Sequence, residues 1–247
     1  MGKTGLFDLE RHFAFYGAYH SNSINVLIHT FFVWPIFFTA LVLLYFTPAL
    51  YTPSPQIGLF QSGFLVFNFG FLLTLIYALF YVAFDKKAGA LAALLCFVCW
   101  VGASFLASRL GFSLAWKNPK THPSPHILPQ TNNYSPHLLF LLSPMPSSRQ
   151  SSGNQLGVLS SHREVVLAAQ LLCWTGQFIG HGVFEKRAPA LLDNLLQAFL
   201  MAPFFVLLEV LQTFCGYEPY SGFHASVKAK IDADRKEWQS KKQKKNS

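Results

Sequence analysis

The sequence predicts an all-α protein: a polytopic bundle of membrane helices with four spans and a kinked or hairpin fifth segment. Of its 247 residues, 52% are hydrophobic and only 12% are charged, whereas soluble domains average about 25% charged residues. Several apolar stretches also reach the roughly 20 residues that a helix needs to cross a bilayer. Both observations indicate a chain that is surrounded largely by lipid.

Four apolar stretches are expected to cross the membrane as helices, namely residues 26–46, 63–84, 88–107 and 165–184. A fifth stretch, residues 190–214, holds Pro203 and Glu209 within apolar sequence. Proline removes a backbone hydrogen-bond donor and bends a helix. The fifth segment is therefore expected to be either a kinked span or a helical hairpin that returns to its own side.

A polar segment separates the third and fourth predicted spans. Residues 117–164 are rich in Pro, Ser, Asn and His, a composition that cannot bury enough apolar surface to order itself. We interpret this segment as a disordered insertion, with untranslated sequence retained in a gene model as the alternative. It divides the membrane domain into residues 1–116 and 165–220, and residues 221–247 form a basic tail.

The positions of lysine and arginine predict the orientation. Basic residues near the span ends favour the cytosolic side, and here they precede the first span, separate the second from the third, and follow the fourth: Lys3, Arg11, Lys86, Lys87, Lys186 and Arg187. We therefore expect a cytosolic N-terminus and a cytosolic tail. The tail carries eight basic and three acidic residues from 228 to 247, but no compact basic fold accompanies it, so no nucleic-acid partner is expected.

Two segments place histidines in or beside apolar sequence. His20 and His29 lie at the start of the first predicted span, and His181 lies near the end of the fourth. Ionisable side chains at membrane depth are costly, so they usually face the interior of a bundle and mark a site. With a cytosolic N-terminus, all three histidines lie at one face of the membrane, as a shared site requires.

The polar residues around these histidines point to a metal site. Helix positions four apart share a face, which pairs Asn25 with His29. The same spacing relates Gln177 to His181 and His181 to Glu185. Imidazoles suit iron or zinc, and two histidines with one carboxylate suit Fe(II) oxygen chemistry. Asn25 and Gln177 are candidates to orient the imidazoles, and Glu185 is a candidate fourth ligand.

Structural roles for the same residues are the alternative. A histidine at a membrane interface commonly only hydrogen-bonds to a neighbour, and Glu185 is followed by Lys186 and Arg187 in what could be an interfacial charge cluster. The chain would then be a non-catalytic lipid-binding or scaffold protein of the membrane. A zinc hydrolase is a further alternative. The sequence contains no G-x-S-x-G elbow, Walker loop or dinucleotide fingerprint, which argues against those classes of enzyme.

These motifs together resemble a known family. His20, Asn25 and His29, followed by the motif GHGVFEKR-x-PAL at residues 180–191, are similar to the small membrane proteins typified by the fungal 2-hydroxy fatty acid dioxygenase of phytosphingosine breakdown. The resemblance covers residues 4–116 and 165–220. The polar insertion departs from the family, whose third and fourth spans are closely linked, and it would misplace His181 if it disturbed the fourth span.

The resemblance implies an enzyme that uses Fe(II) and O2 to shorten a long-chain 2-hydroxy fatty acid by one carbon, in the α-oxidation step of sphingolipid breakdown. By motif match, His20, His29 and His181 are expected to be the catalytic, iron-binding residues. The implied location is the endoplasmic reticulum membrane, with membrane lipids around the protein. The C-terminal Lys244 and Lys245 are similar to a dilysine retrieval signal for that compartment. The acyl chain is expected to lie among the Phe-rich helices.

Overall fold

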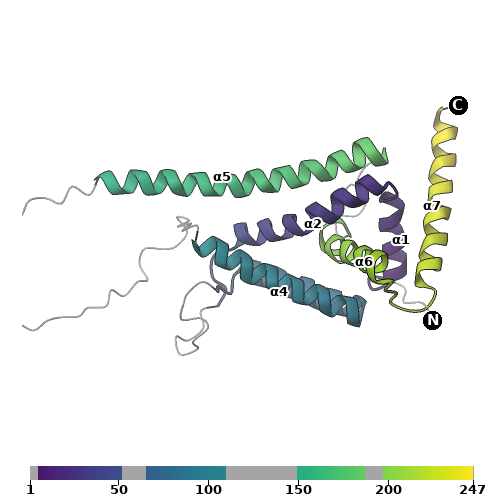
Figure 1. Ribbon diagram of the computed structural model, residues 1–247, viewed down its shortest axis with the longest axis horizontal. Helices are drawn as coiled ribbons and strands as arrows, with labels where there is room; N and C mark the ends of the chain where they lie inside the picture. Colours follow the sequence, from purple (N-terminus) through teal and green to yellow (C-terminus); the bar gives the residue numbers. More distant parts are fainter. Residues whose placement is uncertain (1–4, 52–64, 110–148, 187–196, 247) are drawn as a thin grey trace, which may run out of the picture.

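The computed structural model describes residues 5–51, 65–109, 149–186 and 197–246. Its helices, in chain order, are α1 (Leu9–Tyr19), α2 (Ser23–Leu44), α3 (Phe69–Phe84), α4 (Lys86–Arg109), α5 (Arg149–Ile179), the π-helices η2 (Gly180–Glu185) and η4 (Gln197–Met201), α6 (Ala202–Cys215) and α7 (Phe223–Asn246). Figure 1 shows α2, α4 and α5 running along the length of the molecule, while α1 and α7 lie side by side across one end.

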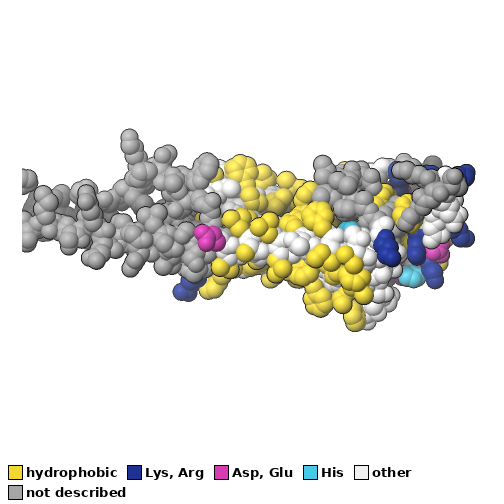
Figure 2. Space-filling view, turned by 90° about the horizontal axis from the view of Figure 1, so that it is seen from above, with side chains coloured by type: hydrophobic (Ala, Val, Ile, Leu, Met, Phe, Trp, Pro, Cys, Tyr) yellow, Lys and Arg dark blue, Asp and Glu magenta, His cyan; other side chains and the backbone are white. Residues whose placement is uncertain are grey.

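The predicted fold class is confirmed. Within the described ranges, three helices are long and apolar enough to cross a membrane: Ser23–Leu44, Lys86–Arg109 and Ala198–Cys215. The apolar helix Phe69–Phe84 is shorter. Large hydrophobic side chains such as Phe31 and Leu94 point outward, and Figure 2 shows apolar surface along the length of the helices. Such an exterior suits lipid rather than water.

Polar caps determine where several helices begin. The side chain of Asn22 accepts a hydrogen bond from the Ile24 amide at the start of α2. Asn68 accepts from the first amides of α3, and Asp85 does the same for α4. A capping side chain satisfies amides that have no partner within the helix. The Asn68 cap explains why α3 begins at Phe69, later than the predicted start of the second span at residue 63.

The C-terminal part of the predicted polar insertion is helical in the structure. Helix α5 begins at Arg149, so residues 149–164, predicted to be disordered, are helical. The physical reason is that the prolines of the segment end at Pro146 and none occurs between Arg149 and the apolar sequence that starts at Val165. Residues 117–148 lie outside the described part of the chain.

The described part of the fifth apolar segment is helical on both sides of Pro203. Pro203 lies just after the junction of the π-helix η4 and α6, within the continuous helix Ala198–Cys215. Its missing N–H leaves the Phe199 carbonyl, four residues earlier, to accept from the Tyr77 hydroxyl instead. The helix ends at Gly216, whose φ of 60° provides the left-handed cap. The part of this predicted segment from 190 to 196 lies outside the described residues.

An aromatic core fixes α1 against the bundle. Phe204 and Phe205 of α6 are fully buried. The Phe205 ring packs edge-on against Phe13 of α1 at 5.5 Å between centroids, and the Phe204 ring stacks on Tyr81 of α3. Pairs of this geometry add to the free energy gained from burial. Through these pairs α6 packs against both α1 and α3, and the last turn of α1 leads into the site.

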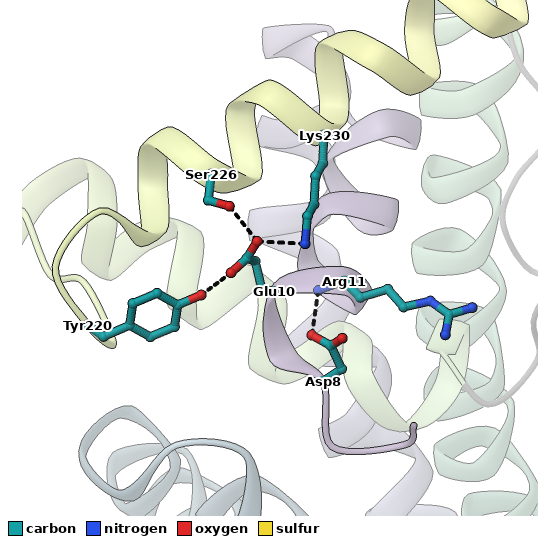
Figure 3. A network of polar contacts seen from close by, with 6 residues as sticks. All are labelled: Asp8, Glu10, Arg11, Tyr220, Ser226 and Lys230. Carbon is teal, nitrogen blue, oxygen red and sulfur yellow. Dashed lines mark hydrogen bonds and ion pairs between the residues drawn. The ribbon is translucent and has the colours of Figure 1, made fainter. Parts of the chain in front are cut away.

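A polar network holds α7 against the other side of α1 (Figure 3). The Glu10 carboxylate accepts hydrogen bonds from Tyr220 and Ser226 and forms an ion pair with Lys230 at 2.6 Å. Hydrogen bonds from Lys230, Ser226 and Tyr220 lower the pKa of Glu10 to about 2. Beneath the network the buried side chain of Phe223 stacks on α1, so α7 is anchored by both apolar and charged contacts.

This network predicts a pH-dependent stability. Because the pKa of Glu10 is about 2 in the folded protein and about 4.3 in an unfolded chain, its stabilisation is complete above the unfolded value and declines as the pH falls towards 2. Glu10→Gln should destabilise the protein by about 1 kcal/mol at neutral pH, since the ion pair is partly exposed. The gap in melting temperature between the two proteins, measured in detergent, should close below pH 4.

The control is Glu237→Gln. Glu237 pairs with Lys241 one helical turn away, and both side chains are exposed, so this change should barely move the melting temperature. A Glu10→Gln gap that is the same at pH 3 and pH 7 would contradict the assignment.

Candidate metal centre

The three histidines predicted from the sequence meet in the structure. His20 follows the last residue of α1, His29 lies in α2, and His181 lies in η2. The ring centroids of His20 and His29 are 4.3 Å apart, and each is 4.9 Å from that of His181. All three side chains are buried, and one nitrogen from each lies within 4.8 Å of the others. This arrangement can hold a metal ion.

Backbone carbonyls set the orientation of two of the rings. His20 Nδ1 lies 2.7 Å from the Tyr16 carbonyl and His29 Nδ1 lies 2.9 Å from the Asn25 carbonyl. A carbonyl only accepts, so Nδ1 carries the proton in both rings and Nε2 keeps a free lone pair. His20 Nε2 and His181 Nδ1 are buried with no hydrogen-bond partner among the described residues. Unpartnered buried nitrogens on converging rings fit the donor set of a transition metal.

Burial also keeps His20 neutral. Removal from water, together with the nearby His29 and His181, lowers the pKa of His20 well below its usual value. A metal binds the neutral imidazole. The environment therefore prepares this ring for a metal rather than for a positive charge.

A π-helix presents His181. The chain changes from α5 to η2 at Gly180 and ends the π-helix at Lys186, which adopts a left-handed conformation with φ of 53°. Single π turns inside helices are rare and are frequently found at functional sites. Gly180 allows this segment to approach α2, because a Cβ there would overlap the side-chain oxygen of Asn25.

Glu185 lies beside the histidine cluster and connects the segment that carries His181 to the turn that follows His20. Its carboxylate accepts hydrogen bonds from the amides of Ser21 and Asn22, at 3.1 and 2.9 Å, and from the Ser21 hydroxyl. It is not one of the three residues whose ligand atoms converge. The observed role is to tie the end of η2 to the turn between α1 and α2. Its predicted role as a fourth ligand stays a prediction.

The two predicted supporting residues behave differently. Asn25 is fully buried and orients His29 through its backbone carbonyl, while its side-chain amide donates to the Tyr19 carbonyl at 3.3 Å. Gln177 is buried with an unpartnered Nε2. It lines a cavity beside His181 rather than bonding to an imidazole.

That cavity has a volume of about 440 Å³ and begins at the histidines. Its walls are mostly apolar or aromatic side chains from α2, α3, α5 and the η4–α6 region, including Val33, Phe37, Tyr77, Trp174 and Phe199. A cavity of this size and chemistry suits a largely apolar small molecule. The metal-binding cluster therefore lies at one end of an apolar cavity.

Tyr16 is a site residue that the sequence analysis missed. Its ring stacks on His20 at 4.0 Å between centroids, its carbonyl orients the same ring, and its hydroxyl donates to Glu209 at 3.0 Å. Its place four residues before His20 was the available signal, since positions four apart share a helix face. Glu209, isolated in apolar sequence, obtains its buried partner in this way.

The fold and the site together define a helical membrane protein with a candidate transition-metal centre at the head of an apolar cavity. The family model described as "2-hydroxy-palmitic acid dioxygenase Mpo1-like" matches residues 6–214, and the chain belongs to this family. The chain is also similar to the 2-hydroxy-palmitic acid dioxygenase MPO1 of Saccharomyces cerevisiae, with 28% identity over 230 residues that cover 93% of this chain and 91% of the yeast protein. No solved structure matches the chain. The predicted family resemblance is confirmed.

The two glycines that flank His181 offer a matched test of the site geometry. A Cβ at Gly180 would overlap Asn25, whereas one at Gly182 has nothing within 4 Å. Gly180→Ala should therefore push η2 away from α2, with about 1–3 kcal/mol of destabilisation from overpacking and a loss of bound metal. Gly182→Ala should bind metal as the native protein does.

The measurements are the metal content of purified protein and the melting temperature. Both Gly→Ala changes raise helix propensity by the same amount. A difference in metal content or melting temperature between the two variants therefore reports the contact of residue 180 with Asn25. Equal metal content in the two variants would contradict the packing of η2 against α2.

Proposed function

We propose that this chain is an Fe(II)-dependent dioxygenase that shortens long-chain 2-hydroxy fatty acids. The reaction takes one 2-hydroxy acid and one O2, and it yields the fatty acid one carbon shorter, CO2 and water. The bond between the carboxyl carbon and the hydroxyl-bearing carbon breaks. The observation that carries the proposal is the buried three-histidine cluster at the head of an apolar cavity, in a chain that belongs to this dioxygenase family.

His20, His29 and His181 would hold the iron. Three neutral imidazoles leave open positions on an Fe(II) ion, as oxygen-activating sites require. When bound, Fe(II) supplies the activation of O2, which side chains alone cannot achieve. The backbone carbonyls of Tyr16 and Asn25 fix two of the rings, so the ligand set is oriented before any ion binds.

The chain's own residues would bind and orient the substrate. Gln177 presents an unpartnered amide N–H at the cavity wall beside His181, where it can donate to the carboxylate or the 2-hydroxyl. The apolar wall formed by residues such as Val33 and Phe37 excludes water around the reacting carbon. A dry cavity favours transfer of oxygen to the substrate over side reactions with solvent.

We also propose a location in the endoplasmic reticulum membrane, with the N-terminus in the cytosol and the activity serving sphingolipid breakdown. Most Lys and Arg side chains visible in Figure 2 lie at the end of the molecule that α1 and α7 form, and basic residues favour the cytosolic face.

Histidine variants test the proposed function. His20→Ala, His29→Ala and His181→Ala should each reduce bound iron about tenfold or more and abolish O2-dependent conversion of 2-hydroxypalmitic acid, because each removes one of three ligands. Product fatty acid and iron per chain are the measured quantities, with purified protein in detergent. The control is His224→Ala, since His224 is exposed on α7 and its replacement should leave both unchanged.

Metal exchange distinguishes this proposal from the two alternatives. Chelation should remove the activity, and Fe(II) but not Zn(II) should restore it. Anaerobic activity restored by zinc would indicate a hydrolase instead. A native protein that binds no iron and forms no product would favour a non-catalytic lipid-binding or scaffold protein.

A further inference from the structure

Two antiparallel helical segments supply much of the wall of the cavity, which is called the channel below. From α2 it is lined by His29, Val33, Ile36, Phe37 and Ala40, and from α5 and η2 by His181, Phe178, Gln177, Trp174 and Gln170. Each set recurs every three or four residues, so each forms one face of a helix. The histidines mark one end of both sets, and Ala40 and Gln170 mark the other.

Three contacts establish this register. The segments lie side by side at Asn25 and Gly180, and Phe32 fits against Gly176. At the far end, Thr39 is hydrogen-bonded to Gln170. Ala40 lies eleven positions after His29, and Gln170 lies eleven positions before His181. Eleven positions correspond to about 16 Å along a helix. This length is suited to an extended acyl chain of the long-chain class.

Helix α3 closes the channel from the side. The Tyr77 ring stacks on Phe37 at 5.0 Å between centroids, and its hydroxyl donates to the Phe199 carbonyl at 2.8 Å. Gly70 lies next to Leu41 of α2, so α3 runs antiparallel to α2. Leu73, one turn before Tyr77, therefore lines the cavity near the level of Ala40.

We propose that the far end of this channel, formed by Ala40, Leu73 and Gln170, sets the acyl-chain length that the enzyme accepts. The inference rests on the proposed function, because the occupant is the acyl chain of the 2-hydroxy acid. Its polar head is held at the histidines and Gln177, so its methyl end must reach the far end of the same continuous cavity. The side chain of Gln170 is hydrogen-bonded to Thr39, and the apolar side chains of Ala40 and Leu73 lie at the same end for contact with that methyl group.

Ala40 is the residue whose size matters most at this position. Its methyl group is the smallest side chain that α2 contributes to the channel. A larger side chain there would take up space at the far end without touching the histidines, eleven residues away. Selectivity for chain length then follows from the methylene groups that fit, each of which contributes to binding through its buried area.

The test compares Ala40→Leu and Leu73→Ala with Ala90→Leu, which adds the same bulk at an exposed position of α4. The substrates are 2-hydroxylauric, 2-hydroxymyristic, 2-hydroxypalmitic and 2-hydroxystearic acids. Ala40→Leu should lower kcat/KM for the longer acids relative to the shorter ones, by about tenfold for two methylene groups that no longer fit. Leu73→Ala should shift the preference towards longer acids, and Ala90→Leu should keep the native profile.

A second readout does not need turnover. Displacement of a fluorescent fatty acid by the same series should show the same shifts in length preference with metal-free protein. A native protein that binds the acids but does not convert them would refute the proposed function while leaving the length inference testable. An unchanged length ranking in both Ala40→Leu and Leu73→Ala would overturn the inference. If Ala40→Leu does not fold, the inference is decided by Leu73→Ala alone: a preference shifted towards longer acids supports it, and an unchanged preference overturns it.

Discussion

The hydrogen bonds of the Glu185 carboxylate hold together the two parts of the chain that supply the histidines. Glu185 closes η2 just after His181, and it accepts from the amides of Ser21 and Asn22, just after His20. A charged acceptor with several amide donors forms strong hydrogen bonds. Since Asn22 also caps α2, the same contact fixes where the helix that carries His29 begins. The convergence of all three rings depends on this junction.

The rest of the molecule supports that junction from two sides. The aromatic core between α1 and α6 and the polar network between α1 and α7 hold α1 in place. On the other side, the close approach of α5 and η2 to α2 requires Gly176 and Gly180, where a Cβ would overlap the partner helix. This packing leaves an apolar channel that opens directly onto the histidines. In the proposed function, the metal, the polar head and the acyl chain would each have a separate place in this one cavity.

The sequence predicted that His20, His29 and His181 would meet, because ionisable side chains in apolar sequence usually face the interior of a helical bundle. The roles of the neighbouring residues were harder to predict. Glu185 lies four positions after His181, a spacing that fits a metal ligand and a structural carboxylate equally well. Only the fold shows that the amides of Ser21 and Asn22 donate to this carboxylate. Asn25 was a candidate to orient an imidazole, and in the structure it is its backbone carbonyl that lies at His29 Nδ1. The start of α5 at Arg149 was missed. The polar composition of residues 117–164 predicted disorder, and the lack of proline after Pro146 was given too little weight.

The central claim is that His20, His29 and His181 together hold the iron. X-ray absorption at the iron edge of Fe(II)-loaded protein tests it most directly. The account predicts a first shell with three imidazole nitrogens, lost in His20→Ala and retained in His224→Ala. Iron held by fewer than three imidazoles in the native protein, or a shell unchanged by His20→Ala, would contradict it.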